Sequence, residues 1–200
     1  MGKVIEAIAI QRGHSIELKV NRMNLDFDLD LLSACDVAIE FSSPKSAIEN
    51  INKCFDANVP VVVGTTGWYA EFNAVQERCL SENKGLLYAT NFSVGVNIFY
   101  EINKKLAALM DANSQYDVGV EETHHTQKVD APSGTAISLA EGIIDNLDRK
   151  DSWKNDIIVF ENELGIESKR IENVPGTHIV KYESDIDIVE IKHEAKNRNG

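Results

Sequence analysis

The sequence predicts an α/β chain with a parallel sheet in its first half and an α+β unit with an open mixed sheet in its second half. Two observations lead to this prediction. Strand-like and helix-like segments alternate through the first part of the chain, which is the pattern of βαβ units. A long amphipathic helix then opens the second half, and strand-like segments fill the last quarter. The boundary is expected near Ser93.

The first half divides into helices and strands in turn. Apolar residues at helical spacing from Val4 to Ala9, followed by Gly13, predict a helix and its end. A serine and a proline then supply the cap and first turn of another helix. Further on, the apolar run VPVVVG is typical of a strand buried on both faces. The predicted strands are 15–20, 36–41, 59–64 and 85–90, and the further helices are 42–58 and 71–82.

The second half begins with a helix over 96–110, for which we predict a buried face formed by Ile98, Ile102, Leu106 and Leu109. A strand near 116–121 and a helix over 133–147 follow, with Pro132 at an early helical position. Further strands are predicted at 156–162, 166–172, 177–183 and 188–195, with a hairpin at 184–187. These elements predict one open sheet with two helices on one face.

Composition excludes several classes of function. The net charge of −12 and the pI near 4.8 argue against nucleic acid and anionic membranes as partners. No apolar run approaches the roughly 20 residues of a membrane span, and the first residues lack the pattern of a secretory signal. The three cysteines have no CxxC spacing, which favours a reducing, cytoplasmic compartment without disulfides or a zinc site.

Two loops follow predicted parallel strands, at the edge where open α/β sheets bind ligands. Gly64, Thr65, Thr66 and Gly67 offer close backbone approach and two hydroxyls, although a plain strand-to-helix turn fits them as well. The segment 89–93 follows the next strand. There Asn91 is a candidate ligand contact or simply a cap of the following helix.

The stretch VEETHHTQKVDAPSGTA (120–136) contains more candidate catalytic and ligand-binding side chains than any other segment. Its turn, residues 130–135, precedes a helix, whose first N–H groups are unpaired and carry partial positive charge. Ser133 and Thr135 add hydroxyls, and His125 and Lys128 add donors and charge. We therefore predict an anion pocket rather than a capped helix with surface histidines.

A metal site is not expected in this stretch. Neither HExxH nor HxxEH is present, and neighbouring residues on a strand, such as His124 and His125, point to opposite faces. Ser133 lacks the GxSxG elbow of a hydrolase nucleophile.

The motif E-x-x-H-H-x-x-K-x-D-A-P-S-G-T-A resembles the signature of the dihydrodipicolinate reductase family. The segments DVAIEFSSP, VVVGTTGW, ATNFSVGVNIF, VPGTHIVKY and KHEAKNR are similar to family segments in family order, so the resemblance covers essentially the whole chain. It implies His124 and Lys128 as the catalytic pair. It further implies that substrate carboxylates are held by His125, Ser133, Gly134, Thr135 and Arg198, and that the cofactor is contacted by Gly64, Thr65, Thr66, Gly67, Ala89, Asn91 and Phe92.

The resemblance also implies a reaction and an organisation. A hydride from NADPH or NADH adds to a cyclic, imine-like dicarboxylate of lysine and diaminopimelate synthesis, and the enamine formed is then protonated by a group that remains open between His124 and Lys128. Residues 1–93 would be a Rossmann-like dinucleotide-binding domain, and 94–200 a domain for substrate binding and oligomerisation. The family's homotetramer would use the second sheet, with Val189, Ile191 and His193 on one face.

The sequence departs from the family at its ends. It lacks the opening strand and the G-x-G-x-x-G loop, so we expect a fragment truncated at both ends, with weak cofactor binding and poor turnover. Asn21 and Arg22 stand where the family commonly has an acidic residue, which favours NADPH slightly, through contact of Arg22 with a 2′-phosphate. The alternatives are a non-catalytic dicarboxylate-binding remnant of such a reductase and a different oxidoreductase of related fold.

Overall fold

The computed structural model of the chain describes residues 1–21 and 28–197. The chain divides into two compact units, Met1–Thr90 and Asn91–Gly200, each with its own hydrophobic core. Within the described ranges, no helix is both long enough and apolar enough to cross a membrane.

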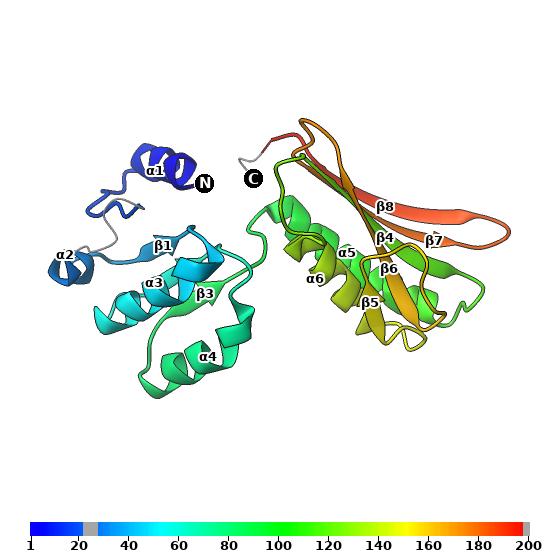
Figure 1. Cartoon of the computed structure of the whole chain (residues 1–200), viewed down its shortest axis with the longest axis horizontal. Helices are drawn as coiled ribbons and strands as arrows, with labels where there is room; N and C mark the ends of the chain where they lie inside the picture. Colours follow the sequence, from blue (N-terminus) through cyan, green and yellow to red (C-terminus); the bar gives the residue numbers. More distant parts are fainter. Residues whose placement is uncertain (22–27, 198–200) are drawn as a thin grey trace. The chain divides into compact units, whose positions relative to one another are not determined.

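The first unit is built on a parallel sheet of three short strands in the order β1-β2-β3 (Figure 1). Strand β1 (Ala38–Glu40) pairs in parallel with β2 (Val61–Val63), which pairs in parallel with β3 (Leu86–Tyr88). Helix α3 (Pro44–Asp56) connects β1 to β2. A 3₁₀ turn (Tyr69–Glu71) and helix α4 (Phe72–Ser81) connect β2 to β3. The predicted succession of strands and helices over this region is confirmed.

The core of the first unit forms where α3 packs on the sheet. Ile51 and Phe55 of the helix are fully buried, as are Val61 and Val63 of the central strand. The apolar run of β2 is therefore buried for the reason predicted, since a central parallel strand needs apolar side chains on its packed faces.

The chain before β1 differs from the prediction. Helix α1 (Gly2–Gln11) ends before Gly13, whose φ of +83° requires glycine, but none of its side chains is buried. A short helix, α2 (Leu29–Ser33), precedes β1. The predicted strand at 15–20 is wrong, because this segment has no strand pairing and its side chains are mostly exposed. Alternation alone does not make a strand without a neighbour to bond to.

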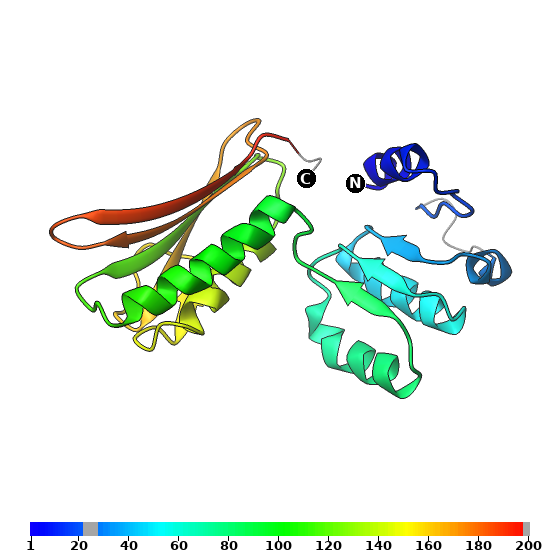
Figure 2. The same ribbon diagram turned by 180° about the vertical axis from the view of Figure 1, so that it is seen from behind.

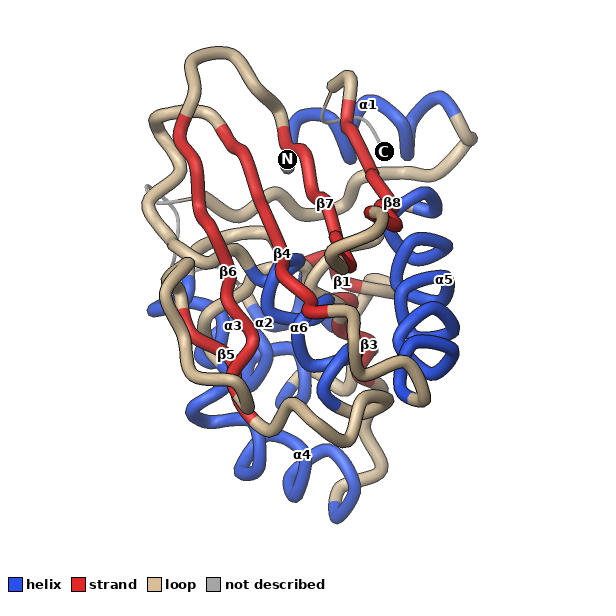
Figure 3. Tube along the Cα trace, turned by 90° about the vertical axis from the view of Figure 1, so that its right-hand side faces the viewer, coloured by secondary structure: helices blue, strands red, loops and turns tan. Residues whose placement is uncertain are grey.

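The second unit is an open mixed sheet of five strands in the order β5-β6-β4-β7-β8. Figure 3 shows β6, β4 and β7 running side by side. Strand β4 is parallel to β6 and antiparallel to β7, and β7 and β8 form an antiparallel hairpin. The strands are β4 (Asp117–His124), β5 (Ser152–Lys154), β6 (Glu163–Arg170), β7 (Gly176–Glu183) and β8 (Ile188–Ala195).

Two helices cover one face of this sheet, as the sequence predicts (Figure 2). They are α5 (Val94–Asp111) and α6 (Gly134–Ile144). Leu139 and Ile143 of α6 are fully buried with Ile166, Val180 and Tyr182 of the sheet. The fold class of the prediction, a Rossmann-like parallel sheet followed by an α+β unit with an open mixed sheet, is confirmed.

The buried face of α5 is not the one predicted. Ile98, Ile102 and Leu109 are 56%, 46% and 72% exposed, and only Leu106 of the predicted face packs on the core. The helix instead buries Val96, Phe99, Asn103, Ala107 and Met110. Apolar residues lie on more than one side of this helix. Contact with α6, where the Asn103 side chain donates to the Leu139 carbonyl at 2.9 Å, fixes the buried side.

Two further expectations in the sheet are wrong. Segment 156–162 is not a strand, because the edge strand β5 lies just before it and Ile157, Ile158 and Phe160 remain exposed. Val189 and Ile191 of β8 do not form an outer face for oligomerisation. They pack inward against the helices' core, so the outer face carries the alternate residues of β8.

We predict that the α6 contact with the sheet stabilises the second unit. Leu139→Ala should lower the free energy of unfolding by roughly 2–5 kcal/mol, because it leaves a cavity in a closed core. Leu109→Ala, on the exposed side of α5, should change it by less than about 0.5 kcal/mol. Urea unfolding followed by circular dichroism measures both, and equal losses for the two variants would contradict the assignment of the buried faces.

Candidate active site

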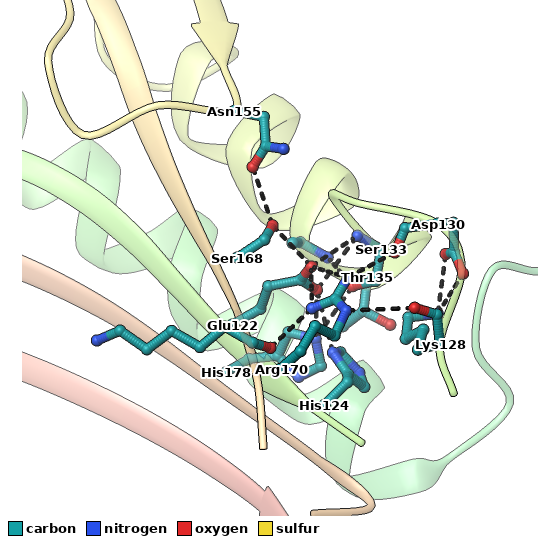
Figure 4. Close-up of polar contacts among 12 residues, drawn as sticks. Glu122, His124, Lys128, Asp130, Ser133, Thr135, Asn155, Ser168, Arg170 and His178 are labelled. Atoms are coloured by element: carbon teal, nitrogen blue, oxygen red, sulfur yellow. Dashed lines mark hydrogen bonds and ion pairs between the residues drawn. The ribbon is translucent and has the colours of Figure 1, made fainter. Parts of the chain in front are cut away.

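The polar groups of the second unit gather where the end of β4 meets the start of α6 (Figure 4). The sheet register brings them together. Glu122 of β4 lies opposite Ser168 of β6 on one side and opposite His178 of β7 on the other. One pleat further along β4, His124 pairs with Arg170 of β6. Strands that are far apart in the sequence thus place their side chains around one carboxylate.

Glu122 is completely buried, and protein donors surround its carboxylate. The backbone N–H of Ser133 donates to both carboxylate oxygens at 3.1 and 3.2 Å. The Ser168 hydroxyl donates at 2.9 Å, and the Arg170 guanidinium lies 3.3 Å away. Burial alone would raise the pKa of Glu122, but the contacts with His124, Ser133 and Ser168 outweigh it and hold that pKa well below its usual range. The group is therefore a buried anion.

His124 lies against this anion. Its ring is 8% exposed, and Nδ1 is 3.3 Å from Oε2 of Glu122. A Cβ at Gly176 would stand 3.1 Å from Nε2 of the ring, so the glycine at the start of β7 makes room for the imidazole. Of the two adjacent carboxylates on β4, Glu122 is the one beside His124. Glu121 points to the other face of the sheet and pairs with Lys169 at 2.7 Å.

His178 completes the buried cluster. Its Nε2 is 3.3 Å from the Ser133 hydroxyl, and its ring meets that of His124 edge-on with 5.0 Å between centroids. Burial, and then the nearby His124, lower the pKa of His178 to about 3. This imidazole is therefore neutral at physiological pH.

The start of α6 is the segment for which the sequence predicts an anion pocket. Ser133 is the N-cap, and its hydroxyl accepts from the Ala136 N–H at 3.2 Å. Gly134 is the first helical residue, and the buried Thr135 hydroxyl accepts from the Asn91 amide at 3.3 Å. Pro132 lies before the cap, outside the helix in which it was predicted. The first N–H groups of a helix attract anions, and the hydroxyls beside them add donors.

Lys128 lies on the loop before this helix, where its ammonium group pairs with both oxygens of Asp130 at 2.8 and 2.9 Å. Arg170 holds the loop in place by donating to the Asp130 carbonyl at 2.6 Å and to the Lys128 carbonyl at 3.4 Å. The same guanidinium thus touches both the buried Glu122 and the backbone that carries Lys128.

His125 points elsewhere. It follows the last residue of β4 and lines a hollow with the loop between β6 and β7. The alternation of side chains along β4 ends at His124, so it does not set the direction of His125.

Three groups with metal-binding chemistry meet in the cluster. One ligand atom from each of Glu122, His124 and His178 lies within 4.8 Å of the others. The sequence prediction considered only local spacing and did not anticipate this grouping, because His178 comes from another strand. The Glu122 oxygens, however, already accept from Ser133 and Ser168 and face a guanidinium. The absence of a metal remains a prediction.

In the first unit, the glycine loop follows β2 as predicted. Gly67 has a φ of +80°, and a Cβ at Gly64 would collide with the Phe41 ring. The Thr65 hydroxyl accepts from the Ser42 N–H at 2.8 Å, which ties this loop to the one after β1. Thr66 is half-buried in the same loop. Gly64 thus leaves room for the Phe41 ring, and Gly67 adopts a backbone conformation that favours glycine.

The loop after β3 has its own network. The Ala89 N–H bonds to the Val63 carbonyl at 3.3 Å. The Asn91 side chain accepts from the Ser93 N–H at 2.9 Å, while Ser93 caps α5. Asn91 thus supports the helix cap without being the cap itself. Phe92 beside it is 41% exposed.

Two candidate residues, Arg22 and Arg198, lie outside the described residues. Conversely, sequence reasoning missed three members of the cluster, Ser168, Arg170 and His178. His178 stands in the family-like segment VPGTHIVKY, which was a usable signal, whereas no local motif marks Ser168 or Arg170.

We predict that His178 makes the fold acid-sensitive. Because its folded pKa of about 3 lies below the unfolded value of about 6.5, the unfolded state binds the proton first. The contribution of neutral His178 to the free energy of unfolding is therefore fully present above pH 6.5. It falls by up to about 1.4 kcal/mol per pH unit as the pH drops from 6.5 toward 3. Urea unfolding between pH 7.5 and 4.5 should show a flatter slope in His178→Gln. His14→Gln, at an exposed site, should keep the wild-type slope, and the same slope in all three proteins would contradict the prediction.

Comparison with known proteins agrees with the arrangement. Residues 2–92 match the family model described as dihydrodipicolinate reductase, N-terminus, and residues 95–200 match dihydrodipicolinate reductase, C-terminus. The 4-hydroxy-tetrahydrodipicolinate reductase of Christiangramia forsetii is 48% identical over 200 residues, which cover 100% of this chain and 83% of that protein. The enzyme of the same name from Rickettsia africae is 34% identical, covering 99% and 82%.

Among solved structures, the dipicolinate-bound dihydrodipicolinate reductase of Paenisporosarcina sp. TG-14 has the same fold. It superposes with a TM-score of 0.59 at 24% identity, covering 86% of this chain and 67% of that one. Both halves of the chain match the family, and the two named relatives cover at least 99% of it at 48% and 34% identity. The chain therefore belongs to the dihydrodipicolinate reductase family.

Proposed function

We propose that this chain reduces 4-hydroxy-tetrahydrodipicolinate (dihydrodipicolinate) to tetrahydrodipicolinate, with NADPH or NADH as hydride donor, in lysine and diaminopimelate synthesis. Its family consists of oxidoreductases with this activity. The observation that carries the proposal is the convergence of His124, Lys128 and the capped start of α6 on one side of the second sheet.

The start of α6 fits a dicarboxylate. Ser133, Gly134 and Thr135 offer hydroxyls and helix N–H groups, which together bind one carboxylate. Lys128 supplies a positive charge from the preceding loop. We assign His125 and Arg198 to further substrate contacts on the family resemblance alone, since His125 lies in a separate hollow. The solved relative named above is itself bound to dipicolinate, a dicarboxylate.

The chemistry requires a proton donor beside this cradle. The nicotinamide cofactor, when bound, supplies a hydride to the conjugated imine of the substrate. The 4-hydroxyl leaves as water before this step, which gives the conjugated imine of dihydrodipicolinate. The electron pair displaced by the hydride moves into the ring as an enamine, and a proton must then reach the ring carbon. His124 and Lys128 are the groups placed to give that proton or to stabilise the charge. Such acid help is typically worth roughly 10²–10⁴ in rate.

The cofactor is assigned to the first unit. Gly64, Thr65, Thr66 and Gly67 stand at the carboxyl end of a parallel strand, where dinucleotides bind in this fold class. The positive φ of Gly67 and the Phe41 ring packed against Gly64 both favour glycine in this loop. Ala89, Asn91 and Phe92, after the next strand, are the further proposed contacts. A preference for NADPH over NADH rests on Arg22.

We propose a homotetramer that assembles through the outer face of the second sheet. Glu121, Ile179 and Lys181 point to this face, and the two helices pack on the opposite one. The acidic composition agrees with a small-molecule substrate rather than nucleic acid or a membrane surface. Cys35, Cys54 and Cys79 are free thiols, as expected in a reducing cytoplasm.

A dicarboxylate-binding protein without turnover is the second candidate. It is favoured by one observation, that the whole candidate cradle from Asn91 to Arg170 belongs to the second unit. Binding to this cradle does not require the glycine loop.

We predict that pyridine-2,6-dicarboxylate, a flat analogue of the substrate, binds the second unit through Lys128. At about 100 times its Kd it should add roughly 2.7 kcal/mol, which raises Tm by about 5–10 °C for a chain of this size. The shift should disappear in Lys128→Ala and remain in Lys105→Ala, an exposed lysine of α5. A thermal-shift titration measures this. An equal shift in Lys128→Ala would remove Lys128 from the site.

We predict that turnover depends on the pair itself. His124→Ala and Lys128→Ala should each lower kcat by about 10²–10⁴, while Ser133→Ala should chiefly raise KM by weakening the carboxylate contact. Oxidation of NADPH in the presence of freshly formed substrate measures these constants. A wild-type chain that binds the dicarboxylate analogue but shows no reduction would favour the binding protein over the reductase.

A further inference from the structure

We propose that Glu122 is a positioning residue that fixes His124 in the tautomer with its proton on Nδ1, so that proton exchange with the substrate takes place at Nε2. The effect on proton transfer to the substrate rests on the proposed function, whereas the tautomer of His124 is a property of the chain alone. The buried carboxylate of Glu122 thus has a task that neither the motif nor the family match states.

The surroundings of the His124 imidazole indicate which of its nitrogens carries the proton. Nδ1 of His124 is buried, and no hydrogen bond of ordinary geometry reaches it from the described residues. The group that faces it is Oε2 of Glu122, at 3.3 Å. An ionised carboxylate can only accept a hydrogen bond, so the imidazole nitrogen beside it must carry the proton. The neutral ring then has its lone pair on Nε2.

Contacts with the protein hold Glu122 as an anion and fix the orientation of its carboxylate beside His124. The Ser133 N–H bonds to both of its oxygens, while Ser168 and Arg170 hold Oε1. Oε2 is thereby left toward the two histidines. These contacts also keep the pKa of the carboxyl well below its usual range, so it stays ionised beside the imidazole.

The His124 ring has little freedom to rotate. His178 packs edge-on against the ring at 5.0 Å, and Gly176 lies close to Nε2. His178 is neutral at physiological pH, so it offers Glu122 no positive charge that would draw the carboxylate away from His124.

Glu122 affects both the proton donor, His124, and the proposed carboxylate site at the start of α6. With the Nδ1 proton directed at Glu122, the ring can give up a proton at Nε2 only from its cationic form. The carboxylate that orients the imidazole also bonds to the N–H of Ser133, the cap of the anion pocket. One side chain thus sets the position of the proton donor relative to the substrate's carboxylate.

The direct test is nuclear magnetic resonance of the histidine rings. Long-range ¹H–¹⁵N correlation spectra at pH 8 distinguish the two neutral tautomers, and His124→Gln identifies the His124 signals by their loss. We expect the Nδ1–H tautomer in the wild type. A wild-type ring with its proton on Nε2 overturns the proposal without any variant, so the test does not depend on a substituted protein folding.

Glu122→Gln should reverse the tautomer. The amide oxygen is needed by Ser133, Ser168 and Arg170, which leaves the amide NH₂ facing His124. Nδ1 must then accept, and the proton moves to Nε2. Glu121→Gln is the matched control on the opposite face of the same strand and should leave the spectrum unchanged. An unchanged His124 tautomer in a folded Glu122→Gln variant overturns the proposal.

A kinetic cycle tests the consequence. Glu122→Gln should lower kcat by up to about 10²–10⁴, the size of an acid–base contribution, and should have no such effect when His124 is already alanine. Equal losses in both backgrounds would show that Glu122 does not act through His124. Because the spectra need no substrate, a failure of turnover in every variant counts against the proposed function and leaves the tautomer result standing.

Discussion

The site of the second unit depends on one buried charge. Glu122 lies near the carboxyl end of the central strand, and its carboxylate faces Ser133 at the cap of α6, Arg170 of β6 and His178 of β7. A charge in this position is tolerated only because its partners are complete, and loss of any one leaves an uncompensated ion in a low-dielectric interior. The end of β4, the start of α6 and the loop that carries Lys128 are therefore held together by the same set of contacts.

The order of the strands makes this possible. Strand β4 is central, with a parallel neighbour on one side and an antiparallel neighbour on the other, so residues from three distant segments stand in one row beside Glu122. The helices fill the apolar part of the same face, and the polar row lies at the end of the sheet where α6 begins. The arrangement resembles many enzymes in which a rigid sheet holds the reacting groups and a helix start receives the anion.

How far the sequence predicts the molecule depends on the range of the interactions. Elements marked by local signals, such as α3 with its serine and proline start, α6 and the apolar run of β2, were predicted close to their observed bounds. Features decided by distant partners were not. The buried side of α5 is chosen by α6, segment 15–20 finds no strand to pair with, and the contacts of Arg170 follow from a register that no local pattern encodes. The motif predicts where the candidate site lies. The partners of the buried Glu122 carboxylate follow from the strand register, which the motif does not contain.

The pairing of Lys128 with Asp130 gives the unliganded site an internal counter-ion. A ligand carboxylate that reaches the ammonium group does not meet a free cation but displaces a carboxylate already bound there. Binding is then an exchange of one anion for another, and the exchange is favourable only when the incoming molecule gains contacts that Asp130 lacks, such as those at the start of α6. A simple monocarboxylate gains few of them, whereas a rigid molecule with two carboxylates gains both at once. Under the proposed function, Asp130 therefore competes with the substrate for Lys128 and disfavours small anions that make a single contact.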